Sequence, residues 1–294
     1  MKHLVTGCSG YLGGKFISRL AELNKDYLCL GRFGRATINK VNPDNFLVPS
    51  SNILDLQNFI LNWSDNEPVT VIHFAAKFTP MHNSSDVSDL IDSNVKYGTQ
   101  ILESISKLPN KKFINICSAW QSQSFYPELF TLYGSSKRAF IEILEFYKQN
   151  SDVNYSNIYL FDNYGEDDSR RKIVQLLIEA AIKGNSLDLR SKDQLINLLH
   201  VDDVLTAILR VLEIENEHKN FIVKSKDFMS VAELSNEIAK IHGGGLSLNW
   251  DTSEGRLIST EKLDSPGMSP PNWSQEIPLN IGLKRVYDNA IRKL

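Results

Sequence analysis

Short apolar runs alternate with longer segments of helical period through the first half of the chain. The clearest run, Val71-Ile72-His73-Phe74-Ala75-Ala76, is nearly continuous, as expected of a strand buried on both faces. The predicted strands are Lys2–Thr6, Tyr27–Leu30, Asn45–Val48, Val69–Phe74, Lys112–Cys117 and Val153–Leu160. The predicted helices between them carry apolar residues three or four positions apart and are Leu12–Leu23, Leu56–Trp63, Val87–Lys107 and Tyr133–Gln149. This order predicts an α/β fold with a doubly wound parallel sheet.

The alternation becomes less regular after Tyr164-Gly165. The predicted helices there are Lys172–Ile182, Val201–Leu212, Val231–Ile241 and a closing Leu283–Leu294. Residues 251–278 are rich in Ser, Pro and Gly and lack a helical period, which predicts a loop. We expect residues 1–164 to form the parallel-sheet domain, with part of the sheet completed by later segments. Residues 165–294 are expected to form a smaller mixed α/β lobe and a C-terminal helix.

Composition and charge favour a small-molecule partner. The 294 residues carry a formal net charge of -3, and Lys and Arg are scattered, so no broad basic surface for nucleic acid is expected. No signal-peptide core and no apolar run of membrane length occurs, so we expect a cytoplasmic protein outside the membrane. Cys8, Cys29 and Cys117 form no Cys-x-x-Cys pair and lie in or beside predicted strands. We expect buried thiols, and neither a disulfide nor a metal site.

Glycines recur at every third position where the first strand passes into the first helix, in Gly7-Cys8-Ser9-Gly10-Tyr11-Leu12-Gly13. Gly7 permits a tight turn, Gly10 lets a pyrophosphate approach the backbone, and Gly13 lets the helix pack closely on the strand. The N-terminus of the helix offers free N–H groups to phosphates. Because the motif lies in a strand–turn–helix unit, it predicts a Rossmann-type dinucleotide site. Ser9, Tyr11 and Leu12 are expected at the cofactor as well.

The end of the second predicted strand indicates which dinucleotide binds. It reads Leu30-Gly31-Arg32, without the acidic residue that would accept hydrogen bonds from the adenosine ribose. Gly31 leaves room for a ribose phosphate, and Arg32, with Arg35 nearby, has the planar fork that pairs with such a dianion. NADP(H) is therefore expected in preference to NAD(H), which also stays open. The alternative is that both arginines are ordinary solvated side chains.

Tyr133 and Lys137 lie one turn apart on the same predicted helix. A lysine ammonium beside a tyrosine favours the phenolate, which eases proton transfer, and it can also bond ribose hydroxyls. Such pairs are common on protein surfaces, but Ser118 ends the fifth predicted strand at the edge of the sheet where α/β proteins bind ligands. Its hydroxyl is placed to hold a substrate carbonyl while Tyr133 exchanges a proton.

Besides the glycine turn, the sequence contains several short motifs spread over most of the chain. They are His73-Phe74-Ala75-Ala76, Asn94-Val95-Lys96-Tyr97-Gly98-Thr99, Ser118-Ala119, Tyr133 with Lys137, and His200-Val201-Asp202-Asp203-Val204. With these motifs the chain resembles the extended short-chain dehydrogenases/reductases of the nucleotide-sugar epimerase and dehydratase group.

The resemblance implies roles for individual residues. Ser118, Tyr133 and Lys137 correspond to the catalytic triad of that family. The implied cofactor contacts are Asn52 and Ile53 beside the adenine, the strand end Phe74, Ala75 and Ala76, the helix residue Asn94, and again Tyr133 and Lys137. For Asn94 an internal hydrogen bond between helix and strand is the alternative, and His73 and His200 are expected to be structural. A homodimer through the helices at 87–107 and 133–149 is also implied.

The chain departs from the family in its substrate-side motifs. Ala119 and Trp120 follow Ser118 where sugar dehydratases have an Asp-Glu pair, which disfavours elimination of water. Asp162 replaces an asparagine that would face the substrate diphosphate, and the arginine expected shortly before His200 is missing. An anion beside a diphosphate costs free energy unless a cation intervenes.

Replacements for the missing groups are open. The candidate cations are Arg190, Lys192 and Arg256, each of which is equally consistent with an exposed surface residue. The segment that follows Ser118 carries Trp120, Phe125, Tyr126 and Phe130, which either line a sugar or base pocket or pack beneath their loop.

These observations favour a carbonyl reductase that acts on a nucleotide-linked 4-keto-6-deoxy sugar and uses NADPH, with Tyr133 as the proton donor. The first alternative is a sugar 4-epimerase that retains NAD. The second is an NADP(H)-binding sensor or scaffold without turnover.

Overall fold

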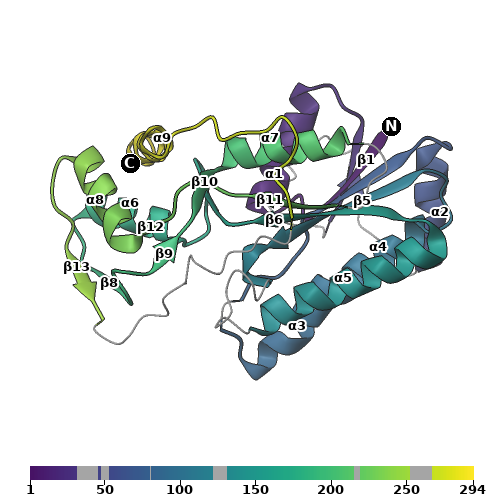
Figure 1. Ribbon diagram of the computed structural model, residues 1–294, viewed down its shortest axis with the longest axis horizontal. Helices are drawn as coiled ribbons and strands as arrows, with labels where there is room; N and C mark the ends of the chain where they lie inside the picture. The colour runs from purple at the N-terminus through teal and green to yellow at the C-terminus, as the bar shows by residue number, and fades with distance from the viewer. Residues whose placement is uncertain (32–45, 48–52, 80, 122–130, 215–218, 252–266) are drawn as a thin grey trace.

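A parallel sheet forms the centre of the molecule. In the computed structural model, which describes residues 1–31, 46–47, 53–79, 81–121, 131–214, 219–251 and 267–294, its seven strands are ordered β11-β6-β5-β4-β1-β2-β3 (Figure 1). Their bounds are β1 Lys2–Thr6, β2 Tyr27–Leu30, β3 Phe46–Leu47, β4 Val69–His73, β5 Lys111–Ser118, β6 Asn154–Leu160 and β11 Lys219–Val223. Every neighbouring pair is parallel, so all seven strands end at the same edge. The predicted doubly wound sheet of the Rossmann type is confirmed.

Helices cover both faces of this sheet. One face packs on α1 (Tyr11–Glu22) and α7 (Val201–Leu212) through a core that includes Phe16 and Ile208. The other face packs on α2 (Ile53–Ser64), α4 (Tyr97–Ile105) and α5 (Leu132–Ser151). The amphipathic period of these segments produces the layers, because each helix turns its apolar side to the sheet.

The predicted helix at 87–107 is helical but not regular. It consists of α3 (Val87–Ile91), a π-helical stretch (Asp92–Lys96) and α4, and a short 3₁₀ turn at Ser84–Asp86 precedes it. The π turn inserts one residue into the helical repeat and carries the buried Asn94. In α3, before the insertion, Leu90 is buried while Val87 and Ile91 are exposed, whereas in α4, after it, Ile101 and Ile105 pack on the sheet.

The second half of the chain builds a smaller lobe and returns to the sheet. Its elements are β7 (Asp162–Tyr164), α6 (Ile173–Lys183), β8 (Leu187–Leu189), β9 (Leu195–Ile196), β10 (Leu198–His200), β12 (Met229–Ser230), α8 (Val231–His242), β13 (Leu248–Trp250) and α9 (Leu279–Ile291). The short strands pair as β10-β7, β12-β9 and β13-β8, and α6, α8 and α9 share one apolar core (Figure 1). Between β10 and β12 the chain forms α7, which covers one face of the large sheet, and β11, which is its edge strand.

The closing helix begins at Leu279, earlier than the predicted Leu283. Residues 267–278 form no helix, as expected, and 252–266 lie outside the described residues. Cys8, Cys29 and Cys117 are buried free thiols, which confirms their assignment as core residues.

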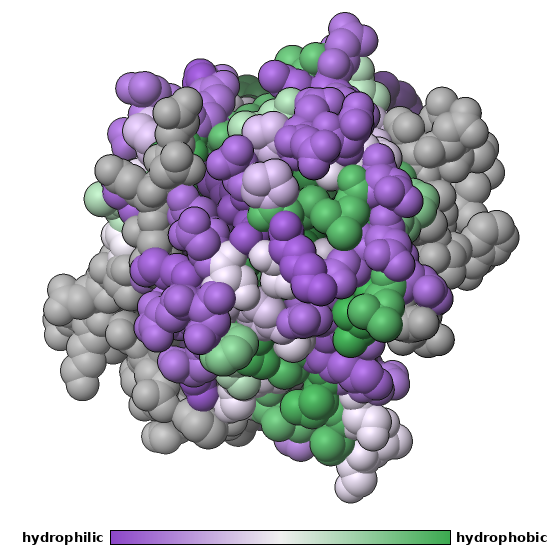
Figure 2. Space-filling view, turned by 90° about the vertical axis from the view of Figure 1, so that its right-hand side faces the viewer, coloured by the Kyte–Doolittle hydropathy of each residue, from purple (hydrophilic) through white to green (hydrophobic). Residues whose placement is uncertain are grey.

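The end of the molecule where the sheet strands begin lies away from the lobe (Figure 1). Figure 2 shows this end, where hydrophilic side chains cover most of the described surface and hydrophobic ones form separate small patches. Within the described ranges, no helix is long and apolar enough to cross a membrane.

Candidate active site

The glycine turn has the geometry that a dinucleotide site requires. Gly7 has a φ of +73°, and a Cβ there would lie 2.6 Å from the backbone nitrogen of Ala75. A Cβ on Gly13 would lie 2.4 Å from the carbonyl oxygen of Gly7. Gly10 caps α1 without a side chain, and the first turn holds no acidic residue. The unpaired N–H groups at the start of α1 therefore fit the phosphates of NAD(P).

The residues between these glycines have different surroundings. Ser9 is exposed at the turn, and Leu12 lines a large cavity at the ends of the strands. The Tyr11 phenol donates a hydrogen bond to the Glu166 carbonyl oxygen (3.2 Å). The guanidinium of Arg170 lies 4.5 Å from the centre of the same ring. Tyr11 thus connects the turn to the lobe, and its backbone remains available to a phosphate.

The remaining predicted cofactor contacts are placed only in part. Arg32 and Asn52 lie outside the described residues, so their assignment stays a prediction. Ile53 opens α2, while Phe74 and Ala76 line the cavity.

Asn94 and His73 have the internal roles that were considered for them. The Asn94 amide accepts from the Lys77 N–H (2.7 Å) and donates to the Lys77 carbonyl (3.1 Å) and the Ser136 hydroxyl (3.0 Å). It therefore ties the segment after β4 to α5. His73 shares a hydrogen bond with the Thr6 hydroxyl (2.8 Å), and burial lowers its pKa to about 3. A neutral, buried imidazole of this kind stabilises the core rather than exchanging protons.

The structure brings Ser118, Tyr133 and Lys137 together. Ser118 ends β5, and the other two lie in the first two turns of α5, whose N-terminus is capped by the Thr131 hydroxyl accepting from the Gly134 N–H (3.0 Å). The hydroxyls of Ser118 and Tyr133 share a hydrogen bond. Lys137 is 1% exposed, and its ammonium donates to the Ile116 carbonyl (2.9 Å).

Burial dominates the protonation of the phenol. It raises the pKa of Tyr133 to about 12, although the hydrogen bond from Ser118 acts in the opposite direction. Burial also lowers the pKa of Lys137. The expectation that Lys137 favours the phenolate therefore stays a prediction. At neutral pH the phenol is a proton donor.

These hydroxyls face a cavity of about 530 Å³ between the sheet and the lobe. Its walls differ in character. Side chains from the segment after β4, from β5 and from α5 are mostly apolar and include Phe78, Ile116 and Trp120. Charged side chains come from the lobe side, and they are Asp162, Arg170, Lys172, Asp188 and Arg190.

Two of these cations were not singled out in the sequence. The Lys172 ammonium lies 3.7 Å from the carboxylate of Asp162. Arg170 donates to the Asp168 carboxylate (2.7 Å) and to the Asn163 side-chain oxygen (2.7 Å). A cation therefore does stand beside Asp162, and a dense cluster of charges in 166–172 was the clue to it.

Of the three candidate cations named from the sequence, Arg190 lies at the cavity. Its guanidinium lies 3.7 Å from the Met81 sulfur. Lys192 is exposed and does not line the cavity, while Arg256 lies outside the described residues. Of the aromatic cluster, Trp120 lines the cavity, and Phe125, Tyr126 and Phe130 lie outside the described residues.

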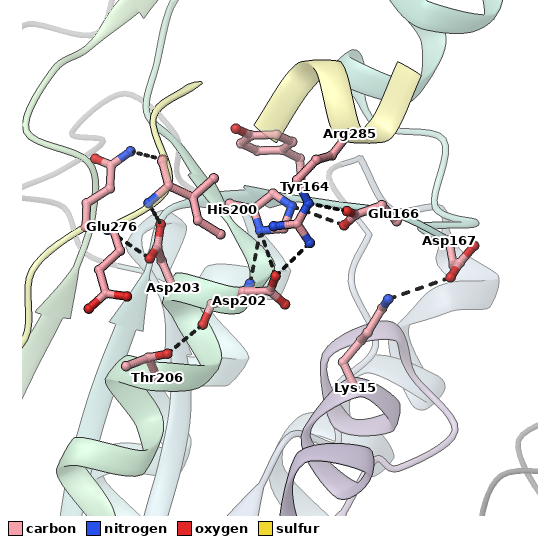
Figure 3. A network of polar contacts seen from close by, with 12 residues as sticks. Lys15, Tyr164, Glu166, Asp167, His200, Asp202, Asp203, Thr206, Glu276 and Arg285 are labelled. Atoms are coloured by element: carbon pink, nitrogen blue, oxygen red, sulfur yellow. Dashed lines mark hydrogen bonds and ion pairs between the residues drawn. The ribbon is translucent and has the colours of Figure 1, made fainter. Parts of the chain in front are cut away.

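His200 belongs to an ion network with Glu166, Asp202 and Arg285 (Figure 3). Its Nδ1 accepts from the Asp202 N–H (3.2 Å), so Nε2 carries the proton and donates to the Glu166 carboxylate (3.1 Å). Arg285 of α9 donates to Glu166 (2.6 Å) and Asp202 (2.9 Å). Burial acts to raise the pKa of Glu166, but the bonds from His200 and Arg285 outweigh it and lower the pKa to about 2. The structural role expected for His200 fits this network.

Among the residues with described positions, no group of three or more His, Cys, Asp or Glu side chains is arranged to hold a metal ion.

The fold and this cavity define the class of the protein. A dinucleotide turn at the start of a doubly wound sheet, and a Ser-Tyr-Lys set at the strand ends, are those of an NAD(P)-dependent oxidoreductase of the short-chain dehydrogenase/reductase type. The sequence profile of the NAD dependent epimerase/dehydratase family matches residues 3–223. The chain belongs to this family.

Relatives and solved structures agree with that placement. The CDP-abequose synthase of Yersinia pseudotuberculosis is 29% identical over 84% of this chain and 87% of its own. A putative UDP-glucose 4-epimerase of Methanocaldococcus jannaschii is 26% identical over 97% of both chains. The UDP-glucuronic acid 4-epimerase of Bacillus cereus, solved with UDP-glucuronic acid and NAD, superposes with a TM-score of 0.81 at 20% identity and covers all of both chains. This last likeness is one of fold.

Proposed function

We propose that this protein reduces the keto group of a nucleotide-linked 4-keto-6-deoxy sugar and consumes NADPH. The observation that carries the proposal is the Tyr133 phenol, which is hydrogen-bonded to Ser118 in the cavity and has its pKa raised to about 12 by burial. A group that is protonated at neutral pH is an acid, as reduction of a carbonyl requires. The glycine turn fits the cofactor, which supplies the hydride when bound.

Ser118, Tyr133 and Lys137 have different roles in the reduction of the carbonyl. The Ser118 oxygen accepts from the Trp120 backbone N–H (3.2 Å). Its own hydrogen, which bonds the Tyr133 oxygen in this structure, would turn to the substrate oxygen when a carbonyl binds. Tyr133 donates its proton to that oxygen as the alcohol forms. Lys137 uses one N–H on the Ile116 carbonyl, and its other donors bond no described residue, so they are available for the ribose hydroxyls next to the nicotinamide.

A nucleotide diphosphate is the group that best suits the charged wall of the cavity. Lys172 offsets the charge of Asp162, and Arg190 adds a further cation. Ammonium and guanidinium groups form strong charge-assisted hydrogen bonds with phosphate oxygens. The relative named CDP-abequose synthase supports a nucleotide-linked sugar.

Reduction is favoured over the two alternatives. The preference for NADPH rests on Arg32, and the absence of an Asp-Glu pair after Ser118 argues against dehydration. A sugar 4-epimerase is supported by the Methanocaldococcus jannaschii relative, and it would retain NAD through purification. The hydrogen-bonded hydroxyls of Ser118 and Tyr133 argue against a sensor without turnover, because binding of the cofactor alone does not require a proton donor.

One assay separates these functions. The purified protein is mixed with NADPH and a panel of nucleotide-linked 4-keto-6-deoxy sugars, and oxidation of NADPH is followed by absorbance. We expect oxidation with at least one sugar, and a fall in kcat of about 10²- to 10⁴-fold in Tyr133→Phe with unchanged binding of NADPH. Tightly retained NAD with interconversion of two hexoses would identify the epimerase instead. Binding without turnover would identify the sensor.

The cofactor preference has its own test. Arg32→Ala should lower kcat/KM for NADPH about 10- to 100-fold, because a charge-assisted pair with the ribose phosphate is lost, and should leave kcat/KM for NADH nearly unchanged. Equal loss with both cofactors would contradict the role of Arg32.

We also propose a cytoplasmic homodimer. Exposed apolar side chains on α3 and α5, namely Val87, Ile91 and Phe146, support contact through the helices at 87–107 and 133–149. Size-exclusion chromatography with light scattering should give a molar mass twice that of one chain. The Ile91→Asp variant should give the mass of a single chain.

A further inference from the structure

Phe78 is an exposed aromatic residue in direct contact with the proposed proton donor. It follows β4, and 51% of its surface is exposed. Its ring meets the Tyr133 ring edge to face, with centroids 5.0 Å apart at 87°. It meets the Trp120 ring in the same way, at 5.6 Å and 82°. Exposure of a large aromatic ring to water is unfavourable, so its position at the cavity indicates a ligand surface.

The segment that carries Phe78 is held from both sides. Its N-terminal end is fixed through Lys77, whose backbone bonds Asn94, and whose ammonium pairs with Asp86 (3.0 Å). Its other end reaches the lobe, where the Met81 sulfur lies 3.7 Å from Arg190. The ring is therefore positioned by the fold and does not depend on its own burial.

The wall that Phe78 forms with Trp120 offers little to a sugar hydroxyl. Among the described cavity residues from β4, the segment after it, β5, α5 and the 3₁₀ turn Ala119–Gln121, hydroxyl groups occur on Ser118 and Tyr133, which bond each other, and the further polar side-chain groups are the Cys117 thiol and the Trp120 indole N–H. The other side chains there are apolar or aromatic, such as Ala76 and Ile116. A hydroxyl placed against the Phe78 ring would lose its water without gaining a hydrogen bond from that ring.

We propose that Phe78 and Trp120 determine specificity by receiving a methyl group on the carbon next to the reacting carbonyl. The proposal rests on the proposed function, because Tyr133 marks the position of that carbonyl. In a 4-keto-6-deoxy sugar the adjacent ring carbon carries a methyl group, whereas the parent hexose carries a hydroxymethyl group there. The methyl group fills an apolar wall, and the extra hydroxyl is disfavoured.

The test measures binding rather than turnover. CDP-6-deoxyglucose and CDP-glucose are titrated calorimetrically into the Tyr133→Phe protein in the presence of saturating NADP⁺. We expect the 6-deoxy compound to bind about 10- to 100-fold more tightly, since an apolar pocket rejects an added hydroxyl by at most about 10². Adding Phe78→Ser should reduce this ratio to about 3-fold or less, while Phe78→Leu, which keeps an apolar wall, should retain it.

Phe59→Ser is the matched control, because Phe59 is 38% exposed on α2, whose apolar side packs on the far face of the sheet. Its ratio should equal that of the parent protein. A ratio near one in the parent, or a ratio that Phe78→Ser leaves unchanged, overturns the proposal. Failure of the reductase function would appear separately, as absence of NADPH oxidation in wild-type protein, and would leave the binding ratio as measured.

Discussion

The ammonium group of Lys172 lies 3.7 Å from the carboxylate of Asp162, and both side chains line the cavity that holds Tyr133. Burial lowers the pKa of Lys172, and Asp162 acts against that shift. The carboxylate thus helps to keep the ammonium charged where water is scarce. Asp162 stands where the sequence resemblance leads us to expect an asparagine. The added negative charge is accompanied by the cation of Lys172, at the start of α6.

Loss of this ammonium should weaken binding of the substrate rather than its chemistry. We expect Lys172→Met to raise KM for the nucleotide sugar about 10- to 100-fold with kcat changed less than about 3-fold, because a charged hydrogen bond to phosphate contributes about 1.5–3 kcal/mol. Steady-state kinetics at two salt concentrations check this. Lys183 is an exposed cation at the far end of α6, paired with Glu179, and Lys183→Met should change neither constant. A fall in kcat alone would contradict the assignment.

The pH dependence of the two reaction directions should differ. Because the pKa of Tyr133 is raised to about 12, the phenol stays protonated from pH 7 to 10. Reduction should be nearly independent of pH there. Oxidation of the product alcohol with NADP⁺ needs the phenolate and should rise about tenfold per pH unit. Initial rates at saturating cofactor test both directions. A plateau of the oxidation rate below pH 9 would show that the phenol ionises more easily.

Glu166 should stabilise the protein in a pH-dependent manner. Its pKa, about 2 in the folded protein, lies below the ordinary value of 4.5, so its contribution is complete above pH 4.5 and is lost as the pH falls toward 2. We expect Glu166→Gln to lower the free energy of unfolding by about 1.5–3 kcal/mol at pH 7. The difference from wild type should shrink at pH 3.5.

Urea unfolding at both pH values measures this difference. Glu237→Gln removes an exposed ion pair with Lys240 on α8 and should cost less than about 0.5 kcal/mol at either pH. An equal cost of Glu166→Gln at the two pH values would mean that the lost interactions are not ionic.

The close contact of α1 with the glycine turn predicts the effect of one methyl group. A Cβ on Gly13 would lie 2.4 Å from the Gly7 carbonyl oxygen, so Gly13→Ala must displace the backbone. We expect a loss of about 1–3 kcal/mol in stability and a loss of dinucleotide binding. Thermal unfolding and fluorescence titration with NADPH report the two effects. In Gly245→Ala the added methyl group meets nothing within 4 Å, and both properties should be preserved.

The sequence was sufficient for the sheet and for the reacting end of the cavity. The run Val71-Ile72-His73-Phe74-Ala75-Ala76 is nearly continuous and apolar, and parallel strands end at a common edge, so Ser118 could be placed at the ligand-binding edge of the sheet without coordinates. The dinucleotide-binding turn could also be predicted from the sequence, because each of its three glycines has its own steric role. Local patterns and topology together carry this information.

The lobe was less accessible for physical reasons. Strands such as Leu195–Ile196 and Met229–Ser230 are too short to display an alternating pattern, and their pairing partners are distant in the chain. Lys172 acquires its meaning only because β7 and the start of α6 face the same cavity. The raised pKa of Tyr133 depends on burial, which a helical spacing does not reveal.

The position of α9 also has a consequence for how the chain is made. Leu283 and Val286 are buried in the core of the lobe, and Arg285 closes the network around Glu166. On the ribosome, the strands of the large sheet emerge before α9 does, so the sheet can begin to form while the core of the lobe is still open. The lobe, and with it the charged wall of the cavity, is completed only after α9 has been synthesised.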